Sequence, residues 1–259
     1  MKLYDAHIHL QDDKLSSTLE SDLQECRKNG IETWICAGTI PEDWAKIQKL
    51  QKQIFGLIPA YGLHPWFIQN DFDSWKEELR SSLSDSSALV GEIGLDAQVE
   101  VSWQKQVDIF LYQWDLALKL DRPVIIHCRK AYEELRELIK KEGSPGQGFL
   151  LHSYSGSKEQ IEEFVRLGAY FSVGGNITSP TNKKAKLNAQ SIPDERILIE
   201  TDAPFMGPYV EGVKWEGANR PQNLLVVFRE LAKLKKKEES KLSSQLEINF
   251  NKFLNLTLE

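Results

Sequence analysis

Eight short runs of apolar and β-branched residues alternate with longer helical patterns along the chain, and this alternation limits its possible folds more than any other feature. The runs span residues 3–6, 32–37, 57–62, 88–91, 123–126, 148–151, 169–173 and 196–200. Several are almost continuously apolar, such as PVIIH and RILIE, which is typical of strands covered on both faces. Eight strand–helix units predict an α/β fold whose parallel sheet closes into a (β/α)8 barrel of the TIM type.

The segments between these runs have the spacing of amphipathic helices. Residues 102–120 carry apolar side chains at a period of 3.6, namely Val107, Phe110, Leu111, Trp114 and Leu118. Residues 131–141 and 158–167 have similar patterns. Helix starts are expected at Ser102, at Pro41 with Thr39 as its cap, and at Pro221, while Gly30 and Gly168 are placed as helix-ending glycines. An extra helix at residues 242–256 is expected to pack on the outside of the barrel.

The length and composition of the chain fit one such barrel. A (β/α)8 domain needs about 250 residues, and this chain has 259, of which 41% are hydrophobic and 27% charged. We find no linker, no low-complexity tract and no sequence repeat, so residues 1–259 are expected to form a single domain. A monomer is the favoured state, with an oligomer left open.

Cysteine usage and hydropathy indicate a cytoplasmic protein. The three cysteines, Cys26, Cys36 and Cys128, lack C-x-x-C spacing, which argues against a disulfide framework and a zinc–thiolate site. The polar N-terminus has no signal-peptide pattern, and no apolar run approaches the ~20 residues of a membrane span. We therefore expect no membrane segment.

The formal net charge of −6 argues against a broad basic face for duplex DNA. Some of the acids are candidates for metal ligands, however, and two divalent ions would bring the charge to about −2. Net charge therefore leaves room for a local basic groove.

The five histidines, His7, His9, His64, His127 and His152, each lie at or just past the end of an expected strand. Catalytic residues of a (β/α)8 barrel gather at this end of the strands. His7 and His9 are two residues apart on a strand, so both rings face the same space. An isolated H-x-H pair is equally typical of two buried or solvated histidines, but the set of five favours metal binding.

Two carboxylates stand at equivalent positions. Glu92 follows the fourth run, and Asp202 follows the eighth in ILIETDAP. A carboxylate in the mouth of a barrel is costly to leave unpaired, and the two oxygens of Glu92 could bridge two cations, with a salt bridge to an arginine as the alternative. Asp202 can bind one ion and accept a proton from a water molecule. Asp96 fits either a helix cap or an acceptor that orients a ligand histidine.

These residues predict a hydrolase with two divalent metal ions. Imidazole and carboxylate ligands suit zinc, manganese or iron and are compatible with magnesium, and two ions ~3.5–4 Å apart activate a water molecule and neutralise a leaving oxygen. Arg129, on the same side of its strand as His127, suits a phosphate or carboxylate of the substrate. Cys128 faces away and is expected to pack in the core. The polar turn SGSKE at residues 155–159 could hold an anion at a helix start.

The motifs resemble those of the TatD-related hydrolases, metal-dependent deoxyribonucleases of the amidohydrolase superfamily. The matching segments are DAHIHL, GLHP, VGEIGLD, RPVIIHCRKA, LLHSYSGS and LIETDAPF, in the family's order across nearly the whole chain. The resemblance implies a distorted barrel with Glu92 and Asp202 as catalytic carboxylates. It implies one metal at His7, His9, Glu92 and Asp202, and a second at Glu92, His127 and His152. It also implies that His64 and Arg129 contact a substrate phosphate.

Three departures from the family pattern lie where a substrate would be gripped. Trp66 stands where the family often has a histidine, Ala97 where an aromatic residue is common, and Asn219-Arg220 in the reverse of the usual order. These departures leave the metal ligands intact, so they bear on the substrate more than on the chemistry.

The favoured activity is phosphodiester hydrolysis of DNA, of the single-strand or 3′-end exonuclease type, in which Trp66 and Phe67 could stack a base if exposed. The alternative is an esterase on the same site, such as a D-aminoacyl-tRNA deacylase or a small phosphoesterase. A binding protein on a decayed barrel would have lost a ligand position, and all six are present.

Overall fold

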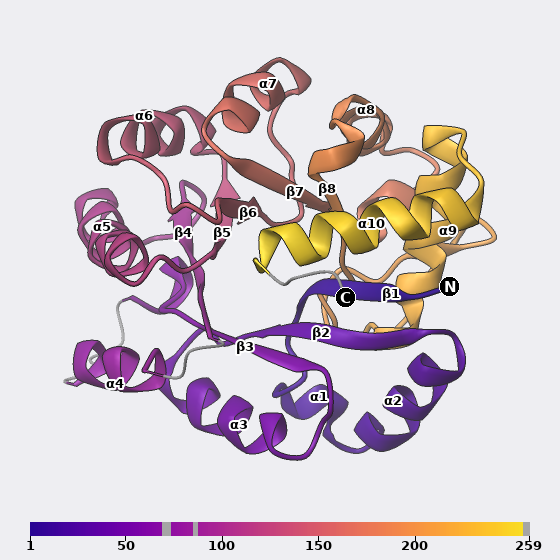
Figure 1. The fold of residues 1–259 in the computed structure, drawn as a ribbon, viewed down its shortest axis with the longest axis horizontal. Coiled ribbons are helices and arrows are strands. Elements are labelled where there is room, and N and C mark those ends of the chain that lie inside the picture. The colour runs from indigo at the N-terminus through magenta and orange to yellow at the C-terminus, as the bar shows by residue number, and fades with distance from the viewer. Residues whose placement is uncertain (69–73, 85–87, 256–259) are drawn as a thin grey trace.

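All eight expected strands are present in the computed structural model, which describes residues 1–68, 74–84 and 88–255. They are β1 (Leu3–Ile8), β2 (Ile31–Ala37), β3 (Leu57–Tyr61), β4 (Leu89–Asp96), β5 (Val124–Arg129), β6 (Phe149–Leu151), β7 (Ala169–Val173) and β8 (Ile197–Ile199). They pair in parallel and in chain order from β1 to β8. Figure 1 shows the strands as a ring with helices outside it, so the predicted (β/α)8 barrel is confirmed.

The helices follow the strands as the periodicity predicts. They are α1 (Asp13–Ser16), α2 (Leu19–Lys28), α3 (Pro41–Gln51), α4 (Trp75–Ser82), α5 (Trp103–Leu120), α6 (Tyr132–Glu142), α7 (Lys158–Arg166), α8 (Lys183–Ser191), α9 (Leu224–Lys235) and α10 (Glu239–Phe253). A small hairpin of β9 (Tyr209–Val210) and β10 (Val213–Lys214) lies between β8 and α9. None of the helices in the described ranges is long and apolar enough to cross a membrane.

The predicted helix starts are correct in position but not always in mechanism. Ser102 occupies the N-cap of α5, yet its side chain makes no capping hydrogen bond. Thr39 is not the cap of α3, because Ile40 takes that place while the N–H and hydroxyl of Thr39 donate to Asp43 Oδ2, at 3.1 and 2.8 Å. Pro221 opens a 3-10 turn that leads into α9 three residues later.

Gly30 and Gly168 end helices as predicted. Their φ angles are +76° and +94°, in the left-handed region that glycine enters without strain. A Cβ atom at Gly30 would lie 2.2 Å from the carbonyl oxygen of Met1. Only glycine therefore lets α2 turn directly into β2 beside the N-terminus.

The barrel closes through the segment that follows β8. Asp202 N donates to His7 O at 3.0 Å, and His9 N donates to Ala203 O at 2.9 Å. The buried carboxylate of Asp5 completes this seam, because it accepts hydrogen bonds from the N–H and the hydroxyl of Thr201, at 3.0 and 2.6 Å. The barrel is distorted at this seam, because β1 and β8 are joined through the Asp5 carboxylate and through the segment that follows β8.

Helix α10 covers the end of the barrel at which the strands begin. The barrel interior is lined by small and medium apolar residues from the strands, and Phe250 and Phe253 of α10 belong to the same cluster. The amide of Asn249 donates to the carbonyls of Asp194 and Ile197, at 2.7 and 2.8 Å, where β8 begins. Figure 1 shows α10 lying across the ring of strands. The expected C-terminal helix is therefore present, but it closes the barrel end instead of joining the outer ring; of its predicted range, residue 256 lies outside the described residues.

Candidate metal centre

The predicted ligand residues meet at the opposite end of the barrel, where the strands finish. His7 lies in β1 and His9 just beyond it, His127 lies in β5, His152 follows β6 and Asp202 follows β8. With Glu92 of β4 they form a cluster that we call the six ligand candidates. Their side chains are buried or nearly so.

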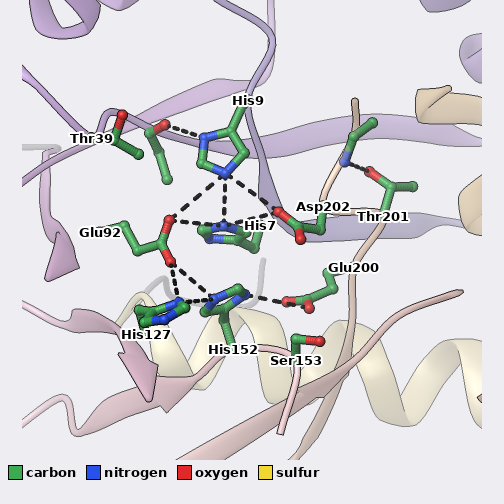
Figure 2. Close-up of polar contacts among 12 residues, drawn as sticks. His7, His9, Thr39, Glu92, His127, His152, Ser153, Glu200, Thr201 and Asp202 are labelled. Atoms are coloured by element: carbon green, nitrogen blue, oxygen red, sulfur yellow. Dashed lines mark hydrogen bonds and ion pairs between the residues drawn. The ribbon is translucent and has the colours of Figure 1, made fainter. Parts of the chain in front are cut away.

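Glu92 lies at the centre of the cluster, between two groups of histidines (Figure 2). Its Oε2 is 3.4 Å from His7 Nε2 and 3.7 Å from His9 Nε2. Its Oε1 is 2.9 Å from His152 Nε2 and 3.4 Å from His127 Nδ1. The two carboxylate oxygens therefore face separate groups of ring nitrogens: Oε2 faces His7 and His9, and Oε1 faces His127, His152 and also His64.

Asp202 completes the group around His7 and His9. Its Oδ1 is 3.3 Å from His9 Nε2 and 3.5 Å from His7 Nε2, and the two Nε2 atoms are 3.2 Å apart. This contact confirms that the H-x-H spacing directs both rings to one place. The φ angle of Asp202 is +54°, so the chain turns sharply here and carries the carboxylate over the end of β1.

Hydrogen bonds outside the cluster fix the tautomers of two histidines. His9 Nδ1 is 2.8 Å from Ala37 O, which can only accept, so this nitrogen carries the proton. His127 Nε2 is 3.0 Å from Asp96 Oδ2, and the pKa of Asp96 is about 2, since hydrogen bonds from His127 and Trp66 outweigh its burial. The nitrogens that face Glu92 and Asp202 are therefore lone pairs when these rings are neutral.

This arrangement fits divalent cations. Lone pairs of His9 and His127 face carboxylate oxygens at 3.3–3.7 Å, so acceptor stands against acceptor and a positive charge must lie between them. A proton or a metal ion can supply it, and a ring held from behind by a carboxylate or carbonyl is typical of metal-binding histidines. Three groups of described residues could each hold an ion: His7, Glu92 and His152; His7, His9 and Asp202; and His64, Glu92 and His127.

The pKa values show how strongly the cluster competes for protons when no metal is bound. Burial disfavours a charged ring, but Asp202 and Glu92 outweigh it and raise the pKa of His9 to about 9. Burial likewise opposes charge on His152, yet Glu92 and Glu200 raise its pKa well above the usual value. The pKa of Glu92 lies well below its usual value, because the surrounding histidines outweigh its burial.

The two residues predicted to contact substrate differ in position. His64 is part of the cluster: its Nε2 is 3.3 Å from Glu92 Oε1, while its Nδ1 accepts a hydrogen bond from Trp66 N at 3.2 Å. Burial lowers the pKa of His64 to about 4, so its ring is neutral. Arg129 ends β5 with an exposed side chain, and no contact between described residues joins its guanidinium to the six ligand candidates.

Sequence reasoning missed a carboxylate behind His152. Glu200 is fully buried, its Oε1 is 3.6 Å from His152 Nδ1, and Ser172 donates a hydrogen bond to its other oxygen. It stands two residues before Asp202 at the end of an apolar strand, which was the available signal. Asp96, whose role the sequence left open between two functions, is the orienting partner of His127.

The three departures from the family pattern have separate structural settings. The indole of Trp66 donates to Asp96 Oδ2 at 2.7 Å, and Ala97 is exposed beside the site. Arg220 is directed to α2, where it pairs with Asp22 Oδ2 at 3.2 Å and contacts the hydroxyl of Thr18. Asn219 is buried, and its amide donates to the carbonyl oxygen of Thr201 at 2.8 Å, next to Asp202. Trp66 and Asn219 therefore both contact residues that adjoin the ligand candidates, whereas Arg220 is directed away from them.

Two smaller predictions concern neighbours of the site. Cys128 is buried, as expected for a packing residue. In the polar turn before α7, Ser157 is the N-cap and its N–H donates to Gln160 Oε1 at 3.2 Å. Anion binding by this turn stays a prediction.

A (β/α)8 barrel with histidines and carboxylates gathered at its strand ends defines the class of metal-dependent hydrolases. Residues 4–255 match the family model described as TatD related DNase. The chain belongs to this family.

Two members of the family are similar to this chain over nearly their full length. The metal-dependent hydrolase YjjV of Escherichia coli K12 is 32% identical over 249 residues, which cover 95% of each chain. The crystal structure of YjjV has a TM-score of 0.91 at 30% identity and covers 98% of each chain. A Klebsiella pneumoniae protein named 3′-5′ ssDNA/RNA exonuclease TatD is 26% identical over 257 residues, 95% of each chain.

Proposed function

We propose that the protein is a divalent-metal-dependent deoxyribonuclease that hydrolyses phosphodiester bonds of single-stranded DNA or 3′ ends. The observation that carries this proposal is the double convergence on Glu92, in which each carboxylate oxygen faces a separate group of histidine nitrogens. The exonuclease name of the Klebsiella relative supports DNA as the substrate.

Two ions, zinc, magnesium or manganese, would be held by the six ligand candidates. One would be bound by His7, His9, Glu92 and Asp202, and the other by Glu92, His127 and His152. Divalent ions bound there supply Lewis-acid stabilisation of phosphoryl charge and lower the pKa of a water molecule.

The remaining chemistry belongs to side chains of the chain. The pKa of Asp202 is lowered, because the neighbouring histidines outweigh its burial, so its carboxylate is available to accept a proton from the attacking water. Glu92 holds the two groups of histidines at a fixed separation. His64, neutral and directed into the site, and Arg129, exposed on the rim, would contact the substrate phosphate.

We propose that residues 1–259 act as one domain, in the cytoplasm and as a monomer. The free thiols of Cys26, Cys36 and Cys128 support a reducing compartment.

The proposal is tested with a 3′-labelled single-stranded oligonucleotide and purified protein supplied with Mg²⁺ or Mn²⁺. We expect release of nucleotides, and a loss of rate of at least about 100-fold in His127→Ala and Glu92→Gln, since each removes a ligand. Phe55→Ala, in an exposed turn before β3 at the other end of the barrel, should cleave like the wild type. Equal rates for wild type and His127→Ala would refute the proposal, and hydrolysis of D-aminoacyl esters or small phosphoesters in place of DNA would favour the esterase alternative.

A further inference from the structure

We propose that Trp66 forms a nucleobase-stacking subsite beside the metal centre. The proposal rests on the nuclease function above and names the part of the substrate that this chain grips. Trp66 lies in the 3-10 turn Pro65–Phe67 that follows β3, on the rim of the site. Half of its surface, 50%, is exposed, which is unusual for a tryptophan placed so close to buried charged groups.

The indole is held in a fixed orientation from one side. Its Nε1 donates to Asp96 Oδ2 at 2.7 Å. Its ring lies 5.2 Å from the ring of His64, at 89°, and 5.9 Å from that of His127, at 76°. One part of the ring is therefore packed against residues of the site, and the other half of its surface is left exposed beside them.

The anchor of the indole is itself part of the metal centre. The same Asp96 Oδ2 that accepts from Trp66 is 3.0 Å from His127 Nε2, and Asp96 Oδ1 accepts from Gln98 N at 2.8 Å. Asp96 is fully buried, so this carboxylate has little freedom to move. A ring fixed in this way loses little conformational entropy when a base stacks on it, which favours binding.

A second aromatic residue borders the cluster but is less suited to the task. Phe205 is 44% exposed and lies 5.7 Å from the ring of His9, at 72°. The ammonium group of Lys14 lies over its ring, 5.0 Å from the centroid. Within the described ranges no cation lies over the indole of Trp66, so this ring is the open platform.

A nucleobase is the occupant that this platform fits. Every base offers a π-face, and stacking on an aromatic side chain strengthens binding of single strands by about 5- to 150-fold per base. The indole adjoins His127, so a nucleotide whose base stacks on Trp66 would have its phosphate within reach of the ligand cluster. The subsite would then select substrates that carry an unpaired base next to the bond to be cleaved.

The test uses two variants that differ in one property. Trp66→Phe and Trp66→Leu both remove the indole N–H, but only the second removes the aromatic ring. The probes are a fluorescein-labelled phosphorothioate octamer of deoxythymidine, which resists cleavage, and the same backbone built from abasic residues. Fluorescence anisotropy in Mg²⁺ gives the Kd for each. Metal titration of both variants checks that they retain equal metal affinity, and Phe55→Leu, 86% exposed at the far end of the barrel, is the matched surface control.

We expect the wild type and Trp66→Phe to bind the thymidine octamer at least about fivefold more tightly than the abasic octamer. Trp66→Leu should bind the two alike. If Trp66→Leu keeps the preference, or if Trp66→Phe loses it fully, the stacking subsite is refuted while DNA cleavage by the wild type still supports the nuclease function. If the wild type neither binds the octamers nor cleaves single-stranded DNA, the nuclease function and the subsite both fail.

Discussion

Metal binding by this protein should release protons, and its affinity should rise with pH. In the metal-free cluster the pKa of His9 is about 9, because Asp202 and Glu92 outweigh the burial of the ring. Its Nδ1 proton is committed to Ala37 O, so the proton lost on metal binding is the one on Nε2. An ion bound at Nε2 must displace that proton at any pH below about 9.

The size of the change in metal affinity follows from the difference between the pKa of His9 and the pH. Well below pH 9, each pH unit weakens apparent affinity about tenfold through His9 alone, and because half of the His9 rings are still protonated at pH 9, affinity at pH 7 should be about 50-fold lower than at pH 9. Burial opposes charge on His127 and His152 as well, but Asp96 and Glu92 raise the pKa of His127, and Glu92 and Glu200 raise the pKa of His152. The pH dependence of metal affinity should therefore be steeper than His9 alone predicts.

Isothermal titration of the metal-free protein with Mn²⁺ at pH 7, 8 and 9 measures this dependence. Repeating the pH 7 titration in two buffers with different ionisation enthalpies gives the number of protons released, which we expect to be at least one. Phe55→Leu, exposed at the other end of the barrel, is the control and should show the same pH dependence and proton release as the wild type. An affinity that is flat from pH 7 to 9, without proton release, would refute the protonated cluster.

Three further predictions concern other parts of the molecule. Burial raises the pKa of Asp5 to about 8, so the stability that its neutral form contributes is complete below about pH 4 and is lost as the pH rises towards 8. In urea denaturation of metal-free protein, Asp5→Asn should therefore be more stable than the wild type at pH 8, by about 1 kcal/mol or more. At pH 4 the variant should have no such advantage. Burial raises the pKa of Cys36 to about 12 and those of Cys26 and Cys128 further, so mass spectrometry should find the native thiols slow to react with iodoacetamide at pH 8 and all three labelled once the chain is unfolded. Asn249→Leu removes the Asn249 donor from the buried carbonyl of Ile197 and the part-buried carbonyl of Asp194. It should lower the free energy of unfolding by about 1–3 kcal/mol, whereas an unchanged urea midpoint would show that these bonds contribute nothing.

The placement of the site was predictable because strand ends in a parallel barrel share one edge. Apolar runs located the strands, and polar residues that followed them had to meet there, as His7, His152 and Asp202 do. The predicted end of β4 at residue 91 was wrong, because the strand extends to Asp96. Glycine usually weakens a strand, so Gly91 and Gly94 indicated an end there. A Cβ atom at Gly94 would lie 1.8 Å from His127 O, so glycine here permits the close approach of β5, and β4 continues past Glu92 to Asp96.

Partners that come from distant parts of the chain were beyond the reach of the sequence. Glu200 lies behind His152, and Asp5 joins Thr201, through contacts that no local spacing encodes. The last helix was predictable as an amphipathic segment, but periodicity shows only that one face is buried. It does not show that Phe250 would enter the barrel interior.

The position of α10 has a consequence for the order in which the molecule can be built. All eight barrel strands and all six ligand candidates precede residue 203 in the chain, yet the barrel interior gains Phe250 and Phe253 only when the chain has been made some fifty residues further. Until then the nascent barrel is open to water at one end, and the strand starts near Lys2 and Ile197 lack the donors that Ser243 and Asn249 provide. Helix α10 is therefore the segment that completes the barrel at the end opposite the ligand candidates, and synthesis of the chain supplies it last.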